Sequence, residues 1–296
     1  CASCPDGVDA NETRRLLEVF QGLAAHLRRP HYPPDMIDPF GRHISYLRVS
    51  VTDRCDFRCV YCMAEDMTFL PKAEVLSLEE LERLCSAFVR LGVNKLRLTG
   101  GEPLVRPDAV EIVRDMAQLG VSLGITTNAM TLDRHLDGLI EAGLKNINIS
   151  LDTFDAERFK KISRRDGFDR VHANILEALR RGMRVKVNMV VMRGVNDDEL
   201  LRFVEFTRDH DVHVRFIEFM PFAGNHWGRE RVYTYAEMLG HINSVHTVEK
   251  LDDAPHSTAK AYRVNGWPGT FAVISTVTEP FCGDCDRLRL TAEGKM

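Results

Sequence analysis

The chain has 296 residues, of which 44% are hydrophobic and 28% are charged. These values are typical of a folded globular protein and exclude a disordered or fibrous chain. The formal net charge of −4, from 39 Lys and Arg against 43 Asp and Glu, offers no general attraction for nucleic acid, which proteins bind through cationic surfaces. No apolar run reaches the roughly 18 residues that a transmembrane helix needs, so we expect no membrane span.

Short β-rich runs recur after a proline-rich break at residues 31–34. They predict six strands, over Tyr46–Val51, Lys95–Thr99, Leu123–Thr127, Asn146–Leu151, Val185–Val191 and Val212–Phe219. Residues with helical spacing separate these runs. In residues 77–91, leucines recur behind Ser77, and Glu80 follows three residues later, which is the pattern of a capping box.

The alternation of strands and helices predicts a parallel sheet with right-handed crossovers. Six such units make up most of an α/β barrel. We therefore predict the α/β class and a partial (βα)6 TIM-like barrel, with a C-terminal β-containing extension that closes the barrel. The predicted divisions are an N-terminal extension over residues 1–36, the partial barrel over 37–222 and the C-terminal extension over 223–296.

The chain contains eight cysteines, and their grouping indicates a metal centre. Cys55, Cys59 and Cys62 form a C-x3-C-x2-C loop directly after the first predicted strand, at the end where barrel enzymes carry their active sites. Three thiolates on one loop suit three corners of a four-iron, four-sulfur cluster and leave the fourth iron open. A structural zinc ion takes four protein ligands, so zinc stays an alternative that requires a distant fourth residue.

Cations occupy several of the predicted strands, where residues two apart share a face. Because burying like charges together is costly, we expect these cations to converge on a polyanion such as a nucleoside triphosphate. For any one of them taken alone, an outward-facing salt bridge is the alternative. The seven cations are Arg48, Lys95, Arg97, Lys186, Arg215, Arg287 and Arg289.

The cysteine loop, which has Tyr61 before its last cysteine, resembles that of the radical S-adenosylmethionine (SAM) enzymes. The segment Thr99-Gly100-Gly101-Glu102-Pro103 resembles the part of that family that contacts the methionyl group of SAM. The resemblance implies a [4Fe–4S] cluster whose open iron binds SAM and whose electron cleaves SAM to a 5'-deoxyadenosyl radical.

Five further segments make residues 37–296 similar to the GTP 3',8-cyclase family of molybdenum cofactor biosynthesis. They are Asp38–Arg42, Lys95–Pro103, Asn148–Asp152, Arg215–Phe222 and Phe281–Arg289. The resemblance implies cyclisation of GTP to (8S)-3',8-cyclo-7,8-dihydroguanosine 5'-triphosphate, the first step of that pathway. It also implies a second [4Fe–4S] cluster, held by C-terminal cysteines.

The family's functional positions carry over to this sequence residue by residue. The first cluster and the start of the chemistry fall to Cys55, Cys59 and Cys62. The SAM site takes Tyr61, Gly100, Gly101, Glu102, Ser150 and Met220. The GTP site takes Arg48, Lys95, Arg97, Thr126, Lys186, Arg215, Arg287 and Arg289. The second cluster takes Cys282 and Cys285. The family pattern places the third cysteine of that cluster beyond Met296, so we expect the second cluster to be incomplete in this chain. At Ala129 the family usually has glycine, and we expect little consequence.

The resemblance implies a one-electron donor, a downstream cyclic pyranopterin monophosphate synthase and a homodimer as partners, and neither nucleic acid nor a membrane. It implies the mitochondrial matrix for a eukaryotic member and the cytoplasm for a bacterial one; the extended N-terminal segment leans toward the mitochondrion. Two other functions stay open. One is a radical SAM enzyme that modifies peptides with an auxiliary cluster, which would not need the strand cations. The other is a non-catalytic zinc-binding module.

Overall fold

The computed structural model describes residues 36–221, 225 and 227–296. Its strands form one sheet with the order β10-β1-β2-β3-β4-β5-β6-β9-β8-β7. The strands are β1 (Tyr46–Ser50), β2 (Lys95–Thr99), β3 (Ser122–Thr127), β4 (Asn146–Ser150), β5 (Arg184–Val191), β6 (His213–Glu218), β7 (Val248–Lys250), β8 (Lys260–Val264), β9 (Thr270–Ile274) and β10 (Arg287–Leu290). The α-helices are α2 (Leu78–Arg90), α3 (Ala109–Ala117), α4 (Leu132–Glu141), α5 (Ala156–Ser163), α6 (Phe168–Arg180), α7 (Leu200–Asp209) and α8 (Tyr235–Asn243).

The six predicted strands are confirmed as β1 to β6, with ends that differ from the prediction by at most one residue. They pair in parallel in sequence order. The predicted capping box is also present at the start of α2. The Ser77 amide donates to Glu80 Oε2 at 2.8 Å and the Glu80 amide donates to Ser77 Oγ at 3.3 Å, which satisfies two amides that the helix itself leaves unpaired.

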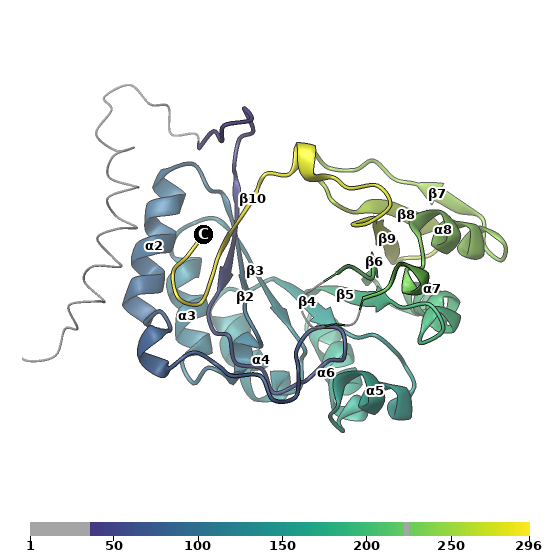
Figure 1. Ribbon diagram of the computed structural model, residues 1–296, viewed down its shortest axis with the longest axis horizontal. Coiled ribbons are helices and arrows are strands. Elements are labelled where there is room, and N and C mark those ends of the chain that lie inside the picture. The colour runs from purple at the N-terminus through teal and green to yellow at the C-terminus, as the bar shows by residue number, and fades with distance from the viewer. Residues whose placement is uncertain (1–35, 222–224, 226) are drawn as a thin grey trace, which may run out of the picture.

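Alternating side chains divide each strand between two environments. In β1, Leu47 and Val49 are fully buried in the core together with Leu84 and Phe88 of α2. Arg48, between them, faces the opposite side of the sheet, since successive strand residues point to opposite faces. The helices lie outside the arc of strands (Figure 1). The concave inner side, which we call the lumen, therefore carries the side chains of positions such as Arg48.

The C-terminal residues lengthen the sheet at both of its ends. β9 pairs in parallel with β6 and β10 pairs in parallel with β1, while β7, β8 and β9 are joined by antiparallel pairing. The segment between β9 and β10 crosses from one end of the arc to the other (Figure 1). The predicted partial barrel is thus confirmed, and the sheet itself is not closed: within the described residues β10 and β7 remain its two edges.

The predicted N-terminal extension, residues 1–36, lies outside the described residues except for Met36. In the described part of the chain, no helix has the length and apolarity to cross a membrane.

Candidate active site

A cavity of about 210 Å³ lies at the carboxyl ends of β2, β3 and β4 and is covered by the cysteine loop that follows β1. This is the edge where barrel folds place catalytic groups. The cavity brings together predicted site residues from four separate segments. These are Cys55, Cys59, Tyr61, Cys62, Gly100, Gly101, Glu102, Thr126 and Ser150.

The three loop cysteines carry free thiols that all line this cavity. Burial raises the pKa of Cys55 to about 12 and raises that of Cys59 well above its usual value. These thiols are therefore protonated until a cation offsets the cost of a buried thiolate, as iron does when it binds sulfur. Within the described residues, no three His, Cys, Asp or Glu side chains are grouped so as to hold a single metal ion.

The glycines of the segment after β2 hold the cysteine loop in place. The Gly101 amide donates to the carbonyl oxygen of Thr52 and the Glu102 amide to that of Arg54, both at 2.8 Å. A Cβ at Gly100 would overlap Thr52 O, and one at Gly101 would overlap Arg54 O. Glycine is thus required by the close approach of these two backbones. The two amides are used internally, so they are not free to bind a ligand.

The Glu102 side chain is also fully hydrogen-bonded within the protein. Its carboxylate accepts hydrogen bonds from Thr127 Oγ1 at 2.6 Å, from the Asn128 amide at 2.6 Å and from the Leu104 amide at 3.0 Å. Burial raises the pKa of Glu102 to about 7, against the opposing effect of these hydrogen bonds. Glu102 therefore joins the end of β3 to the segment after β2, and its side chain already has its partners.

Tyr61 is anchored by a residue to which the sequence assigned no role. Its hydroxyl donates to Asp152 Oδ2 at 2.7 Å, and Asp152 Oδ1 accepts the Val190 amide at 2.8 Å. Burial raises the pKa of Asp152 to about 6. The carboxylate joins the cysteine loop to the ends of β4 and β5.

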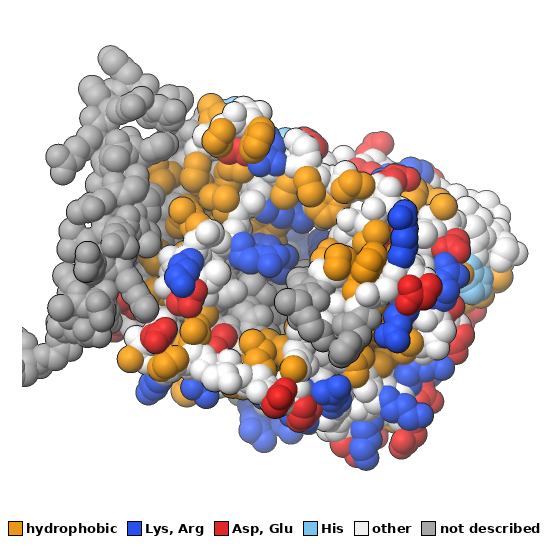
Figure 2. All heavy atoms as spheres, viewed as in Figure 1, with side chains coloured by type: hydrophobic (Ala, Val, Ile, Leu, Met, Phe, Trp, Pro, Cys, Tyr) orange, Lys and Arg blue, Asp and Glu red, His pale blue; other side chains and the backbone are white. Residues whose placement is uncertain are grey.

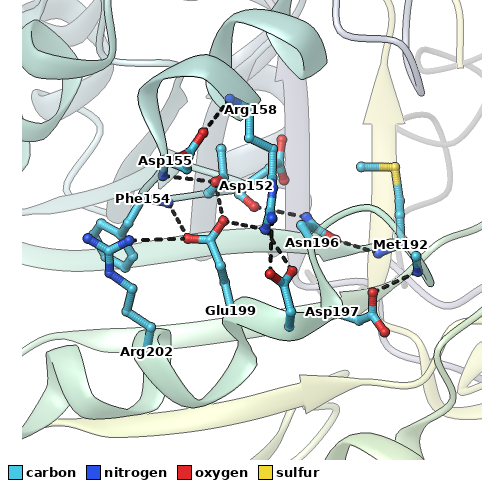
Figure 3. A network of polar contacts seen from close by, with 12 residues as sticks. Asp152, Phe154, Asp155, Arg158, Met192, Asn196, Asp197, Glu199 and Arg202 are labelled. Atoms are coloured by element: carbon cyan, nitrogen blue, oxygen red, sulfur yellow. Dashed lines mark hydrogen bonds and ion pairs between the residues drawn. The ribbon is translucent and has the colours of Figure 1, made fainter.

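A polar network behind Asp152 fixes the loop between β4 and α5 (Figure 3). The Asn196 side chain donates to Asp152 O at 2.8 Å and to Val190 O at 2.9 Å. Glu199 accepts from the Phe154 amide and from Arg158 Nη1, each at 2.7 Å. The segment before α7 thereby holds the loop that positions Asp152, and through it Tyr61.

Met220 is the one predicted SAM residue that does not line this cavity. Its carbonyl oxygen accepts from Asn225 Nδ2 at 3.0 Å, and the same nitrogen lies 3.3 Å from the carbonyl oxygen of Tyr61. Met220 is thus linked to the cysteine loop through Asn225.

The predicted cations converge in the lumen beside this cavity. Arg48 lies in register between Arg289 of β10 and Arg97 of β2. Lysine and arginine side chains surround the hollow at the middle of the face drawn in Figure 2. Repulsion acts across the lumen: burial, followed by the charge of Arg97, lowers the pKa of Arg215 to about 10, although β6 and β2 are not neighbours in the sheet.

Among these cations, Lys186 has the pKa that is lowered most. Burial, followed by the charges of Arg215, Arg97 and Lys95, lowers the pKa of Lys186 to about 7. The pKa of Lys95 is also lowered, first by burial. The cations from β2, β5 and β6 therefore destabilise one another in the absence of a counter-charge.

Five buried polar atoms on these strands have no hydrogen-bond partner among the described residues. They are the Nε atoms of Arg48, Arg215 and Arg287 and the Oδ1 atoms of Asn148 and Asn188. Buried polar atoms are nearly always paired, since leaving one unpaired is costly. These atoms therefore indicate a ligand that accepts hydrogen bonds from arginine and donates to carboxamide oxygens.

Register joins the lumen to the cysteine cavity. Thr126, which lines the cavity, is in register with Asn148, and Asn148 is in register with Lys186. Ser150 is likewise in register with Asn188, which is in register with Arg215. The cation-rich lumen thus adjoins the thiol cavity.

Cys282 begins a short 3-10 turn, Cys282–Asp284, and Cys285 follows it, just before β10. Both are free, and the Arg42 guanidinium donates to the Cys282 carbonyl oxygen. The pKa of Arg42 is raised, mainly by its hydrogen bond to Asp38 and to a smaller extent by the two cysteines. A cation therefore stands beside this cysteine pair.

Sequence reasoning missed Asp152, and it missed Tyr46 and Gly124, which both lie against the Arg97 side chain. A usable signal existed for Asp152, a carboxylate two residues after Ser150 at the end of a buried strand.

Ala129, where the family usually has glycine, has φ +61° and is fully buried. This left-handed backbone costs an L-residue about 1 kcal/mol and explains why glycine suits the position.

Family comparisons agree with this geometry. Residues 49–207 match the Radical SAM superfamily. The chain belongs to the radical SAM superfamily. Membership implies a [4Fe–4S] cluster and SAM. Residues 212–296 match the family described as Molybdenum Cofactor Synthesis C, so the resemblance to both groups that the sequence predicted is confirmed.

Several known proteins are similar to the chain. Molybdenum cofactor biosynthesis protein 1 of Drosophila melanogaster is 51% identical over 88% of this chain and 47% of its own length. The mitochondrial GTP 3',8-cyclase of Arabidopsis thaliana is 47% identical over 88% of this chain and 68% of its own. The GTP 3',8-cyclase of Rhizobium etli is 44% identical over 93% and 80%. The chain spans less than half the length of the animal relatives it matches.

The solved structures support the fold. SuiB of Streptococcus suis, bound to the precursor peptide SuiA, superposes with a TM-score of 0.57 at 17% identity, over 82% of this chain and 54% of SuiB. At this identity the likeness concerns the partial barrel alone.

Proposed function

We propose that this chain cyclises GTP to (8S)-3',8-cyclo-7,8-dihydroguanosine 5'-triphosphate in a SAM-dependent radical reaction, the first step of molybdenum cofactor biosynthesis. The observation that carries the proposal is a lumen lined by mutually repelling cations with unpaired arginine Nε atoms, directly beside a three-thiol cavity. The names of the Arabidopsis and Rhizobium relatives support it.

In this proposal Cys55, Cys59 and Cys62 hold the first cluster. SAM would be held beside Gly100, Gly101 and Glu102, where the Gly101 and Glu102 amides stay bonded to the cysteine loop, and by Tyr61, Ser150 and Met220. When bound, the cluster and SAM supply a one-electron cleavage that yields a carbon radical. The protein fixes the cysteine loop through the Thr52 and Arg54 carbonyl oxygens and through Asp152, so that the thiols keep one geometry.

The lumen side chains bind and orient GTP. The triphosphate offsets the charges of Arg48, Lys95, Arg97, Lys186, Arg215, Arg287 and Arg289. Each charge-assisted hydrogen bond contributes about 1.5 to 3 kcal/mol, so several together hold a triphosphate at micromolar strength after the cost of association. Thr126 lies where the lumen meets the cavity, a place suited to the part of the nucleotide that reacts.

We further propose that Cys282 and Cys285 supply two ligands of a second cluster. Arg42 beside them favours an anionic group at that turn. A nearby arginine favours the charged form of a thiol and so lowers the electrostatic cost of placing two thiolates close together.

The test is an anaerobic assay of the reconstituted protein with reductant, SAM and GTP. We expect 5'-deoxyadenosine whose formation depends on GTP, together with a cyclised nucleotide. A fully loaded cluster that produces neither would contradict the proposal. SAM cleavage stimulated by peptide and not by GTP would favour the peptide-modifying alternative, and zinc without iron or sulfide would favour the zinc-binding module.

The finer partner and location assignments belong to the same proposal. They are a one-electron donor, a downstream cyclic pyranopterin monophosphate synthase, a homodimer and the mitochondrial matrix, a location that the name of the Arabidopsis relative supports. The division at residues 222 and 223 between barrel and extension is proposed on the same footing.

A further inference from the structure

Tyr46 is a buried tyrosine at the start of β1, with 7% of its surface exposed. Its register partners are both cations, Lys95 of β2 on one side and Arg287 of β10 on the other. Neither the sequence motifs nor the proposed substrate contacts include it. It lies at the centre of a group of cations.

The phenol contacts three of those cations with different atoms. Arg97 Nε donates to the Tyr46 hydroxyl oxygen at 2.9 Å. Lys95 Nζ lies 4.5 Å from the ring centroid and Arg287 Cζ lies 5.2 Å from it. Both ring distances are within the range in which a cation is attracted to an aromatic face. One side chain therefore binds three groups of like charge that would otherwise repel.

Arg97 is held on two further sides. Its Nη1 donates to Ile125 O at 3.1 Å. A Cβ at Gly124 would lie 3.0 Å from Cζ and from both Nη atoms of Arg97, which are its nearest atoms apart from those of the adjacent residues. Glycine at 124 thus makes room for the guanidinium. Nη2 of Arg97 makes no hydrogen bond within the described residues, which leaves it for a ligand.

The ionisation of Tyr46 reflects the same contacts. Burial alone would raise the pKa of Tyr46, but the charge and hydrogen bond of Arg97, with the charges of Lys95 and Arg48, bring it below its usual value. The phenol oxygen is thus surrounded by positive charge.

We propose that Tyr46 is a positioning residue that preorganises Lys95, Arg97 and Arg287 to receive the polyphosphate of the substrate. The proposal rests on the proposed function, which supplies the polyanion. Tyr46 acts through the three cations and not by touching the reacting atoms. Preorganisation of this kind raises affinity because the ordering cost is met before the ligand arrives.

The test compares Tyr46→Phe with Tyr46→Leu by calorimetric titration of the reconstituted protein with GTP, inorganic triphosphate and SAM. Tyr46→Phe keeps the ring and removes only the acceptor for Arg97. We expect it to weaken GTP and triphosphate about 10-fold, the loss of one charge-assisted hydrogen bond. Tyr46→Leu also removes both ring contacts, and we expect a loss of about 100-fold. SAM affinity stays within about two-fold in each, because the SAM site does not depend on these cations.

Tyr262→Phe is the matched control. Tyr262 is similarly buried, lies on β8, and has Lys250 5.4 Å from its ring centroid; its hydroxyl bonds to Tyr235. The Tyr262→Phe variant should keep the wild-type affinity for GTP, even if its melting temperature falls. A merely structural role for Tyr46 predicts that the two phenylalanine variants behave alike.

Gly124→Ala gives a second route to the same cation. The new methyl displaces the Arg97 guanidinium without altering Tyr46, so we expect a loss of GTP affinity like that of Tyr46→Phe, and no additive loss when the two are combined. Wild-type affinity for GTP in Tyr46→Phe would overturn the inference alone. A wild-type protein that binds neither GTP nor triphosphate would overturn the proposed function and the inference with it.

Discussion

The thiol cavity and the cationic lumen are neighbouring regions built on opposite principles. Around the thiols, the polar side chains of Glu102, Asp152 and Asn196 have partners within the protein. In the lumen, five buried polar atoms have no hydrogen-bond partner among the described residues, and the cations lower one another's pKa. The side chains that fasten the cysteine loop thus have their partners without a ligand, although Asp53 Oδ1 and Arg58 Nε of that loop are also without a hydrogen bond in the described residues. Several side chains of the lumen lack such partners.

The difference explains how one chain handles two different ligands. A cluster requires three sulfurs in one fixed geometry, so the loop that carries them is fastened by backbone hydrogen bonds and by glycines that permit close contact. A polyanion requires several positive charges close together. Internal carboxylate partners would neutralise those charges, so the cations are left without them. Changes in the first region should therefore act through geometry, and changes in the second through charge.

Loss of a loop cysteine should have the largest effect. Cys59→Ala removes one of the three proposed iron ligands, and we expect activity to be abolished and iron content to fall from about four atoms per chain, the content of one cluster, to well below that. Iron and sulfide assays after anaerobic reconstitution measure this. Cys85→Ala is the control, because Cys85 is fully buried in the core and should keep full iron content while losing stability. Full iron content in Cys59→Ala would show that another residue binds the cluster.

Gly101→Ala should break the cavity by geometry alone. The added methyl would overlap the Arg54 carbonyl oxygen, so the cysteine loop must move, at a cost of about 1 to 3 kcal/mol or more. We expect lower iron loading and a lower melting temperature, measured by iron assay and calorimetry. Gly240→Ala, on α8, meets no atom within 4 Å and should be neutral or slightly stabilising. Equal behaviour of the two variants would show that the loop does not depend on Gly101.

Arg97→Ala should act through charge and on one ligand only. Removal of a buried guanidinium with several hydrogen-bonding nitrogens should weaken GTP binding by about 10- to 100-fold. SAM affinity should stay within about two-fold, because Arg97 does not line the thiol cavity. Titration with each ligand measures both. Arg208→Ala, an exposed arginine paired with Asp209, controls for the loss of one positive charge. An equal loss of SAM affinity in Arg97→Ala would contradict the assignment of Arg97 to the GTP site.

The sequence predicted the fold well because the fold depends on local periodicity. Strand and helix patterns gave β1 to β6 almost to the residue, and the Ser77 capping box is a local signal. The cysteine and cation positions were also visible, since charges inside strands are unusual. The open partial barrel was predicted, but the placement of the C-terminal strands could not be read in the same way. It depends on distant pairing, of β10 with β1 across about 240 positions and of β9 with β6 across 57.

The site residues that were missed are those that act through other residues. Tyr46 resembles an ordinary strand tyrosine until Arg97, Lys95 and Arg287 are placed around it. Gly124 has no turn to explain it, and its reason is the Arg97 side chain on the adjacent strand. The predicted role of the glycines after β2 was also incomplete: the amides of Gly101 and Glu102 bind the cysteine loop, which only the tertiary contact reveals.

Lys186 allows the comparison to be sharpened by pH. Its pKa of about 7 reflects burial and the facing charges of Arg215, Arg97, Lys95 and Arg184; His213 beside it is neutral, because burial lowers its pKa to about 3. Below pH 7 Lys186 is charged and attracts triphosphate, and above pH 7 it loses the proton. We expect the ratio of wild-type to Lys186→Met affinity for GTP to fall severalfold between pH 6 and pH 8. The ratio cancels the titration of GTP itself.

The stability of the ligand-free protein should rise with pH, whereas its affinity for GTP should fall. This difference tests whether the charges of the lumen destabilise the folded chain. The pKa of Lys186 is about 7 when folded and about 10.5 when unfolded, so between these values the unfolded chain binds more protons and the free energy of unfolding rises with pH. The cost of the buried charge is complete below pH 7 and disappears above about pH 10.5. Lys186→Met should therefore stabilise the ligand-free protein by about 1 to 2 kcal/mol at pH 6, and this gain should shrink as the pH rises through 7. Denaturant unfolding at pH 6 and pH 9 measures it. A gain that is the same at both pH values would mean that Lys186 gives up no proton on folding, and that the lumen is not strained by its own charges.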